Sequence, residues 1–354
     1  MQRSVLRQVD PTAVATNAEL LISADSHVDE PPDLWATRLP ADLRDALPPL
    51  PDRSGDLPGA TDPADRLGVM ERDGVSMEVL YPTLGLTQYK LTDAHLQREC
   101  FRVYNDWIVE YCAGTPGRLV GVPMISAYDI DLAVKELERT TAAGLKGALL
   151  WHVPPDGLEY TTGHYDRLWA AAEEMAAPIN LHILSGFSYS SRQRMRGIEQ
   201  FRGSVEYKVM DAIHGLFDFL FYGTLDRFPR LKLVLVEFEI GWIPWILQQW
   251  DYYARRHGEM NGLELSASPS ELFERQVYAT FVSDEVGSHH FPHGWGVRNC
   301  MWSNDFPHGN SSWPNSRQVI DRDLGGLAPE VLRRILSENV TELYGLEAPP
   351  PIGG

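Results

Sequence analysis

Eight short apolar runs, separated by amphipathic segments of helical length, restrict the fold of this chain more than any other feature. The runs occupy residues 20–24, 77–81, 118–124, 145–151, 179–183, 231–236, 277–281 and 299–303. Continuous apolar runs this short are typical of parallel strands that are covered on both faces. Helical patterns occur between them and after the last one, at residues 92–113, 129–143, 165–176, 209–228, 242–257 and 329–343. This alternation predicts a (β/α)8 barrel, with a doubly wound open sheet as the alternative.

The repeats run through most of the chain, and no linker divides them. We therefore predict a single barrel domain over residues 19–346. Residues 1–18 are expected to be a flexible lead-in and residues 347–354 a flexible tail, because order is usually lost at chain ends. An insert rich in Pro, Asp and Leu follows the first strand over residues 31–62, and we expect it to cross one end of the domain irregularly.

The acidic composition narrows the range of partners. The 31 Lys and Arg residues against 49 Asp and Glu residues give a formal charge of −18. This charge repels phosphate backbones and anionic lipids, so nucleic-acid and membrane binding are disfavoured. No apolar run reaches the length of a membrane-spanning helix, and the first residues lack the apolar core of a signal peptide. With three cysteines and no CxxC pair, the sequence predicts a protein of the reducing cytoplasm.

Ionisable side chains stand at the ends of most predicted strands. Asp25 and His27 follow the first strand two residues apart, so both point to one side of an extended chain, and Glu30 is close enough to reach back. The later strand ends carry His152, His182, Glu237 with Glu239, Asp284 with Glu285, and Asp305 with His308. In a barrel these ends meet on one face. Carboxylates and imidazoles that converge there are costly to bury without a cation, and mixed oxygen and nitrogen donors suit Zn, Mn or Fe.

Each of these residues also has a purely structural interpretation. A buried histidine such as His182 is often only hydrogen-bonded within the core, and an aspartate after a strand often caps the next helix. His289, His290 and His293 form a separate group in a loop with Gly and Pro, which suits a solvated lid as well as a second metal site. The motifs GxSxG, GxGxxG, GxxxxGK[ST] and HExxH do not occur, which disfavours serine hydrolases, dinucleotide enzymes, P-loop proteins and zincins.

Four segments resemble the amidohydrolase-related (amidohydrolase family 2) barrels, in the branch that contains metal-dependent decarboxylases and hydrolases. They are ISADSHVDEPPDLW, FPRLKLVLVEFEIGWIPWIL, MWSNDFPHGNSSWPNS and SENVTELYGL. The resemblance implies a metal whose ligands are Asp25, His27, His182 and Asp305. The chain departs from the family at Glu237, where many relatives have a histidine. The bridging lysine of some binuclear members is not evident, because Lys146 lies at the wrong end of its strand.

Glu30, Glu237 and His308 extend the implied ligands to seven donors, too many for one zinc ion with an open position. This excess is similar to a small group of amidohydrolase-fold proteins with two non-heme irons, which includes a hydroxylase of platensimycin- and platencin-type diterpenoid biosynthesis. The resemblance implies a diiron monooxygenase of secondary metabolism that uses O2 to hydroxylate a C–H bond. It further implies a small terpenoid-type substrate, with an acyl-CoA as one option, and an external electron donor, because no flavin or nicotinamide motif is visible.

Substrate contacts are expected from two places. Arg192 and Arg194 follow the fifth strand on the predicted active-site face and would bind an anionic substrate, and a solvated charged loop is the equal alternative. Trp151, with Phe187 and Trp242, is expected to line the pocket and exclude water.

Two other functions stay open. In the first, one Zn²⁺ or Mn²⁺ activates a carboxylate substrate or water, and Glu237 or Asp305 moves the proton of a decarboxylation or hydrolysis. In the second, the barrel has lost its chemistry and serves as a binding subunit, although costly buried charges argue against this function. The sequence identifies neither the substrate nor the metal, and homo-oligomer formation is expected only by analogy with the family.

Overall fold

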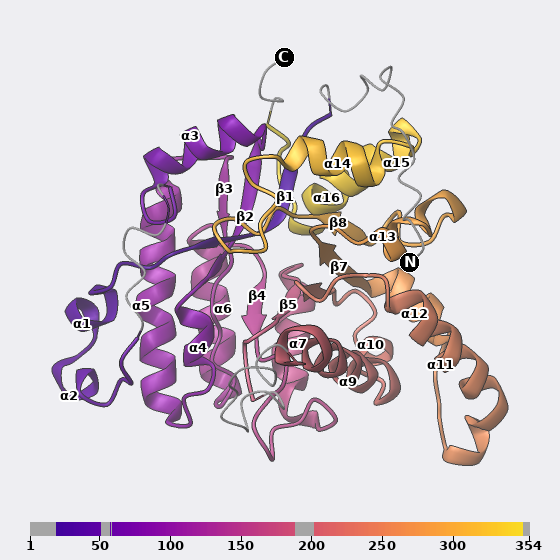
Figure 1. Cartoon of the computed structure of the whole chain (residues 1–354). Helices are drawn as coiled ribbons and strands as arrows, with labels where there is room; N and C mark the ends of the chain where they lie inside the picture. Colours follow the sequence, from indigo (N-terminus) through magenta and orange to yellow (C-terminus); the bar gives the residue numbers. More distant parts are fainter. Residues whose placement is uncertain (1–18, 51–56, 58, 188–201, 350–354) are drawn as a thin grey trace.

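The structure is a barrel of parallel strands enclosed by helices (Figure 1). The computed structural model describes residues 19–50, 57, 59–187 and 202–349. The strands are β1 (Ile22–Val28), β2 (Met77–Pro82), β3 (Leu119–Gly121), β4 (Ala148–Leu150), β5 (Ile179–His182), β6 (Leu233–Val236), β7 (Val277–Phe281) and β8 (Cys300–Trp302). Each coincides with or overlaps one of the eight predicted runs, and nearly every strand residue is buried, as expected for strands covered on both faces.

Main-chain pairing follows the sequence order around the barrel. β1, β2 and β3 form one parallel set, and β4 to β8 form a second. A parallel bridge between Met124 and Leu149 joins the two sets. Beyond β8 the Asp305 N–H donates to the Asp25 carbonyl oxygen over 3.0 Å, which closes the other seam. This closure confirms the barrel in place of the open sheet, and it brings the first and last predicted metal ligands side by side.

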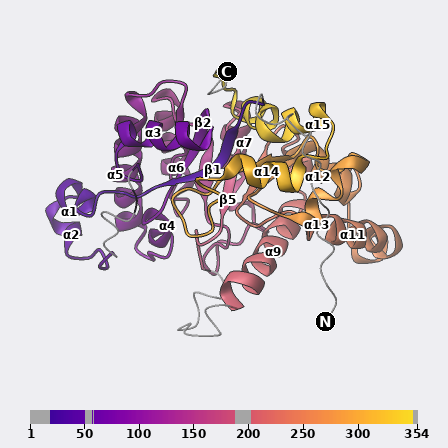
Figure 2. The same ribbon diagram turned by 45° about the horizontal axis from the view of Figure 1, so that its top comes forward.

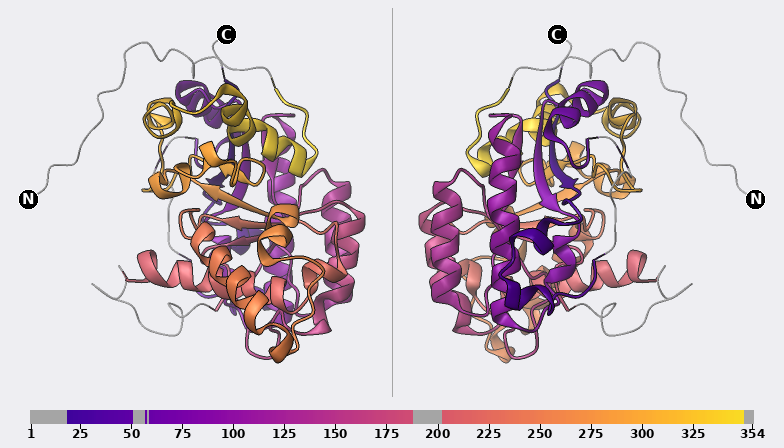
Figure 3. Two further views of the ribbon diagram at one scale, coloured as in Figure 1. Left: turned by 90° about the vertical axis from the view of Figure 1, so that its right-hand side faces the viewer. Right: turned by 90° about the vertical axis from the view of Figure 1, so that its left-hand side faces the viewer.

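Helices cover the strands on all sides (Figures 2 and 3). The α-helices are α1 (Leu34–Arg38), α2 (Ala41–Arg44), α3 (Pro63–Asp73), α4 (Gly85–Gln88), α5 (Ala94–Ala113), α6 (Ile130–Ala142), α7 (Asp166–Glu174), α9 (Lys208–Phe221), α10 (Thr224–Arg227), α11 (Ile243–His257), α12 (Pro269–Gln276), α13 (Glu285–Ser288), α14 (Ser316–Leu324), α15 (Pro329–Arg333) and α16 (Asn339–Tyr344). The 3-10 helices are η2 (Gly163–Tyr165), η5 (Glu259–Asn261) and η6 (Phe291–His293), and the π-helices are η4 (Gly203–Tyr207) and η7 (Arg334–Glu338). Figures 1 and 3 agree that α5 and α11 lie on opposite sides of the barrel.

Side-chain caps explain where several helices begin. Asp62, Asp93 and Asp129 each accept two backbone N–H bonds at the starts of α3, α5 and α6. Ser268 and Glu271 form a reciprocal capping box at the start of α12. These caps satisfy amide groups that the first helical turn leaves without intrahelical partners.

The structure differs from the predicted elements in a few places. The insert over residues 31–62 contains two short helices, α1 and α2, and α1 packs on α5. The predicted helix over residues 209–228 is two helices, because Gly223 takes a left-handed conformation (φ 73°) between α9 and α10. Helices α3, α12 and α14 were not predicted. The proposed lead-in and the end of the proposed tail lie outside the described residues.

Among the helices that the structure describes, none combines the length and the apolar character needed to cross a membrane.

Candidate metal centre

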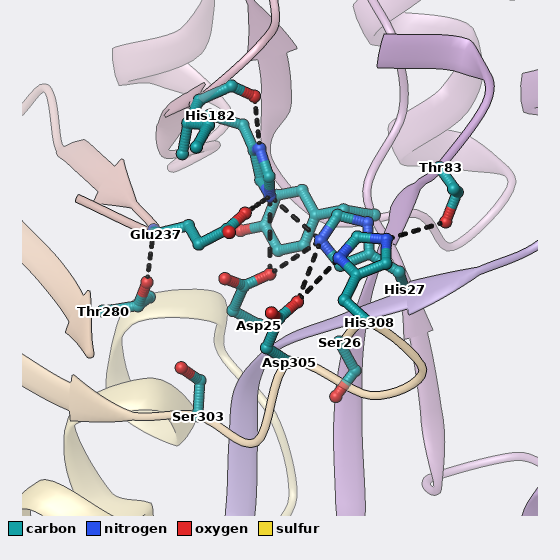
Figure 4. A network of polar contacts seen from close by, with 12 residues as sticks. Asp25, Ser26, His27, Thr83, His182, Glu237, Thr280, Ser303, Asp305 and His308 are labelled. Carbon is teal, nitrogen blue, oxygen red and sulfur yellow. Dashed lines mark hydrogen bonds and ion pairs between the residues drawn. The ribbon is translucent and has the colours of Figure 1, made fainter. Parts of the chain in front are cut away.

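Six ionisable side chains converge at the carboxyl ends of four strands (Figure 4). They come from β1, from the end of β5, and from the residues that follow β6 and β8: Asp25, His27, His182, Glu237, Asp305 and His308. Two overlapping groups of four, each with its candidate ligand atoms within 4.8 Å of one another, include all six. The structure therefore brings together six of the seven donors predicted from the sequence.

Local backbone geometry turns these side chains toward one point. The pairing of β1 with β2 shifts register between Ser23 and Ser26, at the position of Asp25. Glu237, directly after β6, and Asp305, three residues after β8, take left-handed φ values of 66° and 52°. Such values are unfavourable for residues with a Cβ and concentrate at functional sites. The strain at these positions is consistent with side chains that must point into the centre.

Backbone hydrogen bonds orient two of the imidazoles. Nδ1 of His27 lies 2.9 Å from the Pro82 carbonyl oxygen, and Nδ1 of His182 lies 2.7 Å from the Ile183 carbonyl oxygen. Because a carbonyl oxygen only accepts, each Nδ1 must carry the proton. Both Nε2 atoms therefore face the centre, 3.1 Å apart. A metal-binding histidine is oriented in the same way, by the hydrogen bond of its other nitrogen.

The carboxylates at the centre are buried and short of hydrogen bonds. Neither oxygen of Asp25, nor Oδ2 of Asp305, has a hydrogen-bond partner within the described part of the chain. Nε2 of His27 and Nε2 of His182 lie 3.5 and 3.6 Å from Asp25 Oδ1. A buried carboxylate without donors is costly unless a cation compensates it. The donor set fits a divalent ion that accepts oxygen and nitrogen ligands, such as Mn²⁺, Zn²⁺ or Fe²⁺.

The titration behaviour also favours positive charge at this point. Burial lowers the pKa of His182, but the Asp25 and Glu237 carboxylates outweigh burial and raise it to about 9. The pKa of His27 is well below its usual value because of burial and the neighbouring His308 and His182. Burial, and then the charge of Asp305, raises the pKa of Glu237 well above its usual range. Positive charge is therefore favoured beside Asp25 and Glu237, where a cation would compensate the buried carboxylates.

Three further contacts hold the outer donors. The Glu237 N–H donates to Oγ1 of Thr280 over 2.9 Å, and Glu237 Oε2 lies 3.6 Å from His182 Nε2. Nδ1 of His308 lies 2.9 Å from Asp305 Oδ1. The His308 side chain is 20% exposed whereas Asp305 is fully buried, so His308 connects the centre with the surface.

Glu30 does not join the centre, although the sequence suggested that it would. Its Oε2 and Oε1 accept the backbone N–H groups of Leu84 and Gly85 at 2.8 and 2.9 Å. It belongs to neither of the two groups of candidate ligands among the described residues. The expectation failed because backbone amides from the next strand end satisfy both carboxylate oxygens.

Of the predicted substrate contacts, Trp151 lies within the described residues, and it belongs to the core. Trp151 is completely buried, its indole N–H donates to the Tyr89 carbonyl oxygen over 2.9 Å, and its ring meets Tyr128 edge-on. Trp151 is therefore a core residue, and its indole N–H already has a hydrogen-bond acceptor. Arg192 and Arg194 lie outside the described residues.

The other histidines that the sequence singled out also lie elsewhere. His152 is buried and lies 3.6 Å from Asp211 of α9. His289, His290 and His293 belong to no candidate metal group in the described ranges. Sequence reasoning missed Thr83, whose hydroxyl lies 3.4 Å from Nε2 of His308. Thr83 directly follows β2, so the search of strand ends would have found it if hydroxyl groups had been included.

Comparison with known proteins places the chain among metal-dependent barrels. A family model described as "Amidohydrolase" matches residues 24–346. The gamma-resorcylate decarboxylase of Rhizobium sp. is 25% identical over 193 residues, which are 53% of this chain and 58% of that protein. The matches span about half the length of the curated relatives.

Solved structures share the fold. The 5-carboxyvanillate decarboxylase of Sphingomonas paucimobilis superposes with a TM-score of 0.72 at 22% identity and covers 93% of this chain and 99% of its own. The dihydroxybenzoic acid decarboxylase of Polaromonas sp., with bound manganese and 2-nitroresorcinol, gives a TM-score of 0.69 at 17% identity and covers 92% and 97%.

These findings correct the expected reaction. The prediction of a diiron monooxygenase is wrong, because the relatives are decarboxylases and a solved one holds manganese. The expectations of two irons, an electron donor and an acyl-CoA substrate rested on that interpretation and are withdrawn with it. The set of seven donors was too large, since the Glu30 oxygens accept backbone amides. The relatives agree with the alternative of one metal and a decarboxylation.

Proposed function

The chain belongs to the amidohydrolase family, and on this premise we propose that it is a metal-dependent decarboxylase of an aromatic carboxylic acid. The observation that carries the proposal is the meeting of the Nε2 atoms of His27 and His182, 3.1 Å apart, with buried carboxylates that lack hydrogen-bond donors among the described residues. The ligands in this proposal are Asp25, His27, His182 and Asp305, with Mn²⁺ or Zn²⁺ as the ion.

One ion accounts for the donors better than two. Both groups of candidate ligands contain His27 and Glu237. The Nε2 lone pair of a histidine can bind only one cation, so the two groups describe one centre from two sides. An octahedral ion would still leave positions for the substrate.

Bound at this centre, the cation would act as a Lewis acid toward the oxygen atoms of the substrate. The protein must then deliver a proton to the carbon that loses CO2. Glu237 faces the centre and its main chain is held by Thr280, so we assign it the role of the acid that moves this proton. His308 holds Asp305 and reaches the surface, which suits it to exchange protons with solvent.

The relatives support a substrate class for this proposal. Their names refer to gamma-resorcylate, dihydroxybenzoate and 5-carboxyvanillate. We infer a hydroxylated benzoic acid for this chain as well. Arg192 and Arg194 stay a prediction for the binding of its carboxylate.

The test measures metal content and turnover on the same preparation. The protein is stripped with a chelator, reloaded with Mn²⁺ or Zn²⁺, and incubated with 2,6-dihydroxybenzoate and 5-carboxyvanillate under argon. We expect one ion per chain, CO2 release only after reloading, and one deuteron on the product ring in D2O. Asp131→Asn, at an exposed carboxylate of α6, is the control and should not alter these results. Loaded protein that hydrolyses esters or amides but releases no CO2 from any hydroxybenzoate would overturn the proposal.

A further inference from the structure

Glu30 is a buried carboxylate outside the candidate ligand groups, and its surroundings suggest a different use. It is 2% exposed and lies three residues after His27, beyond the end of β1. Its two oxygens accept the consecutive N–H groups of Leu84 and Gly85 at 2.8 and 2.9 Å. These amides belong to the turn that leads from β2 into α4. Glu30 therefore joins the end of β1 to the end of β2 beyond their last paired residues, Val28 and Pro82.

The turn that Glu30 holds, residues 82–85, contacts two imidazoles of the centre. The Pro82 carbonyl oxygen accepts from Nδ1 of His27 over 2.9 Å. The Thr83 hydroxyl lies 3.4 Å from Nε2 of His308, on the side of the ring opposite the Asp305 contact (Figure 4). The next two residues of the turn, Leu84 and Gly85, are those bound by Glu30. Four consecutive residues thus link Glu30 to both histidines.

The close approach of the carboxylate depends on Gly85. A Cβ at this position would lie 3.0 Å from Glu30 Oε1 and 2.8 Å from both Met124 Sδ and Pro82 Cβ. These distances are shorter than ordinary van der Waals contacts, so a larger residue would displace the turn or the carboxylate. The absence of a side chain at Gly85 therefore allows the Glu30 carboxylate to approach the turn.

We propose that Glu30 is a positioning residue for the metal centre. By holding residues 82–85 it keeps the Pro82 carbonyl oxygen where it fixes the proton of His27 on Nδ1, which leaves Nε2 for the cation. It keeps Thr83 beside His308 through the same turn. The inference rests on the proposed metal site, but not on the reaction that the site performs.

The expected effect is a loss of metal affinity. Hydrogen bonds from backbone amides to a carboxylate are stronger than those between neutral groups. Removal of groups that orient metal ligands lowers metal affinity by roughly 10- to 100-fold in other proteins. We expect Glu30→Gln to bind Mn²⁺ about 10- to 100-fold more weakly, because an amide side chain has one accepting oxygen for two N–H donors.

The experiment measures Mn²⁺ affinity by competition with a chelator, and the visible spectrum of the Co²⁺-substituted protein. The variants are Glu30→Gln, Glu30→Asp and Gly85→Ala, with thermal unfolding of the metal-free protein measured in parallel. Glu30→Gln and Gly85→Ala should weaken Mn²⁺ binding and shift the Co²⁺ bands. Glu30→Asp should recover part of the affinity, since it keeps the charge.

A purely structural role would give a different pattern. If Glu30→Gln unfolds at a lower temperature but binds Mn²⁺ as tightly as the parent protein, with an unchanged Co²⁺ spectrum, the inference is wrong. Should Glu30→Gln fail to fold, Gly85→Ala answers the same question, because it disturbs the contact between the turn and Glu30 without removing the carboxylate group. These readouts require no substrate. A protein that loses Mn²⁺ affinity in these variants yet never decarboxylates a hydroxybenzoate would support the inference and contradict the proposed function.

Discussion

Two buried polar regions meet at His27, and they are organised in opposite ways. The imidazole of His27 faces the metal centre, where Asp25 has no hydrogen-bond donor among the described residues. The carbonyl oxygen of His27 faces a network in which Arg66 donates to it over 2.7 Å and to Oε2 of Glu78 over 2.6 Å. Asn304 contacts the other Glu78 oxygen at 3.4 Å. In the metal centre, buried carboxylates lie close together and repel one another. In the network around Arg66, each charge of the Arg66–Glu78 pair has a partner of opposite sign.

The difference distinguishes a binding site from a network that only stabilises the fold. Matched buried charges hold the surrounding structure in place, and removing one partner leaves the other without compensation. Unmatched carboxylates reduce stability by themselves and are retained when something else binds to them. Arg66 also lies 4.5 Å above the Phe306 ring, so the network supports the strand end that carries Asp305.

The largest effect is expected from Asp25→Asn. This change removes a charge from the unmatched region, so Mn²⁺ affinity should fall by more than about 100-fold and turnover should fall to background. The metal-free variant should be at least as stable as the parent protein, because an unmatched buried carboxylate is removed and no hydrogen-bond donor is lost. Chelator competition and urea unfolding measure the two quantities. Strong destabilisation without a change in Mn²⁺ affinity would show that Asp25 is a structural residue, like those of the Arg66 network.

Glu237→Gln should act on turnover. With the amide in place of the acid, we expect kcat to fall by about 10²- to 10⁴-fold, because proton transfer contributes on this scale. Metal content should stay near one ion per chain, since Glu237 is not one of the four proposed ligands. Glu239→Gln, two residues further on, is the matched control and should reduce kcat less than about tenfold. Equal losses in both variants would mean that Glu237 is not the acid.

Arg66→Met should act on stability. It leaves Glu78 buried without its ion-pair partner, so the free energy of unfolding should fall by about 3–5 kcal/mol. Arg38→Ala provides the control, since the Arg38–Glu110 pair is 38% and 60% exposed and should contribute about 1 kcal/mol or less. Denaturant titration measures both changes. If the two variants lose similar stability, the network around Arg66 does not stabilise the fold more than a surface ion pair does.

For Glu30 we expect a dependence of stability on pH, spread over a window of about 2.5 pH units. Burial raises its pKa from 4.5 to about 7, against the backbone bonds from Gly85 and Leu84. The folded protein therefore retains a proton that the unfolded chain has lost between these two values, and stability falls as pH rises through this window. Relative to Glu30→Gln, the parent protein should lose about 3 kcal/mol from pH 4.5 to 7, as a shift of 2.5 units implies. If the free energies of unfolding of the two proteins change with pH in parallel, Glu30 does not titrate in this window.

The sequence predicted the strands well because their signal is local. Each buried strand is a short apolar run, and the polar residue at its end interrupts that run, as His182 and Glu237 do. Helices such as α3 and α14 were missed because their apolar faces are weak among many charged residues. The reaction could not be predicted, because the same donors serve several metals and several chemistries.

By itself, the sequence determined the eight repeats, the strand ends that carry chemistry, and the common side on which Asp25 and His27 lie. Only the tertiary structure decided which donors remain available to a metal. Glu30 and Asp25 look alike in the sequence, but the fold brings the amides of Leu84 and Gly85 to one of them and no donor in the described residues to the other. The availability of a carboxylate depends on what packs against it, and those atoms come from residues 54 and 55 positions away.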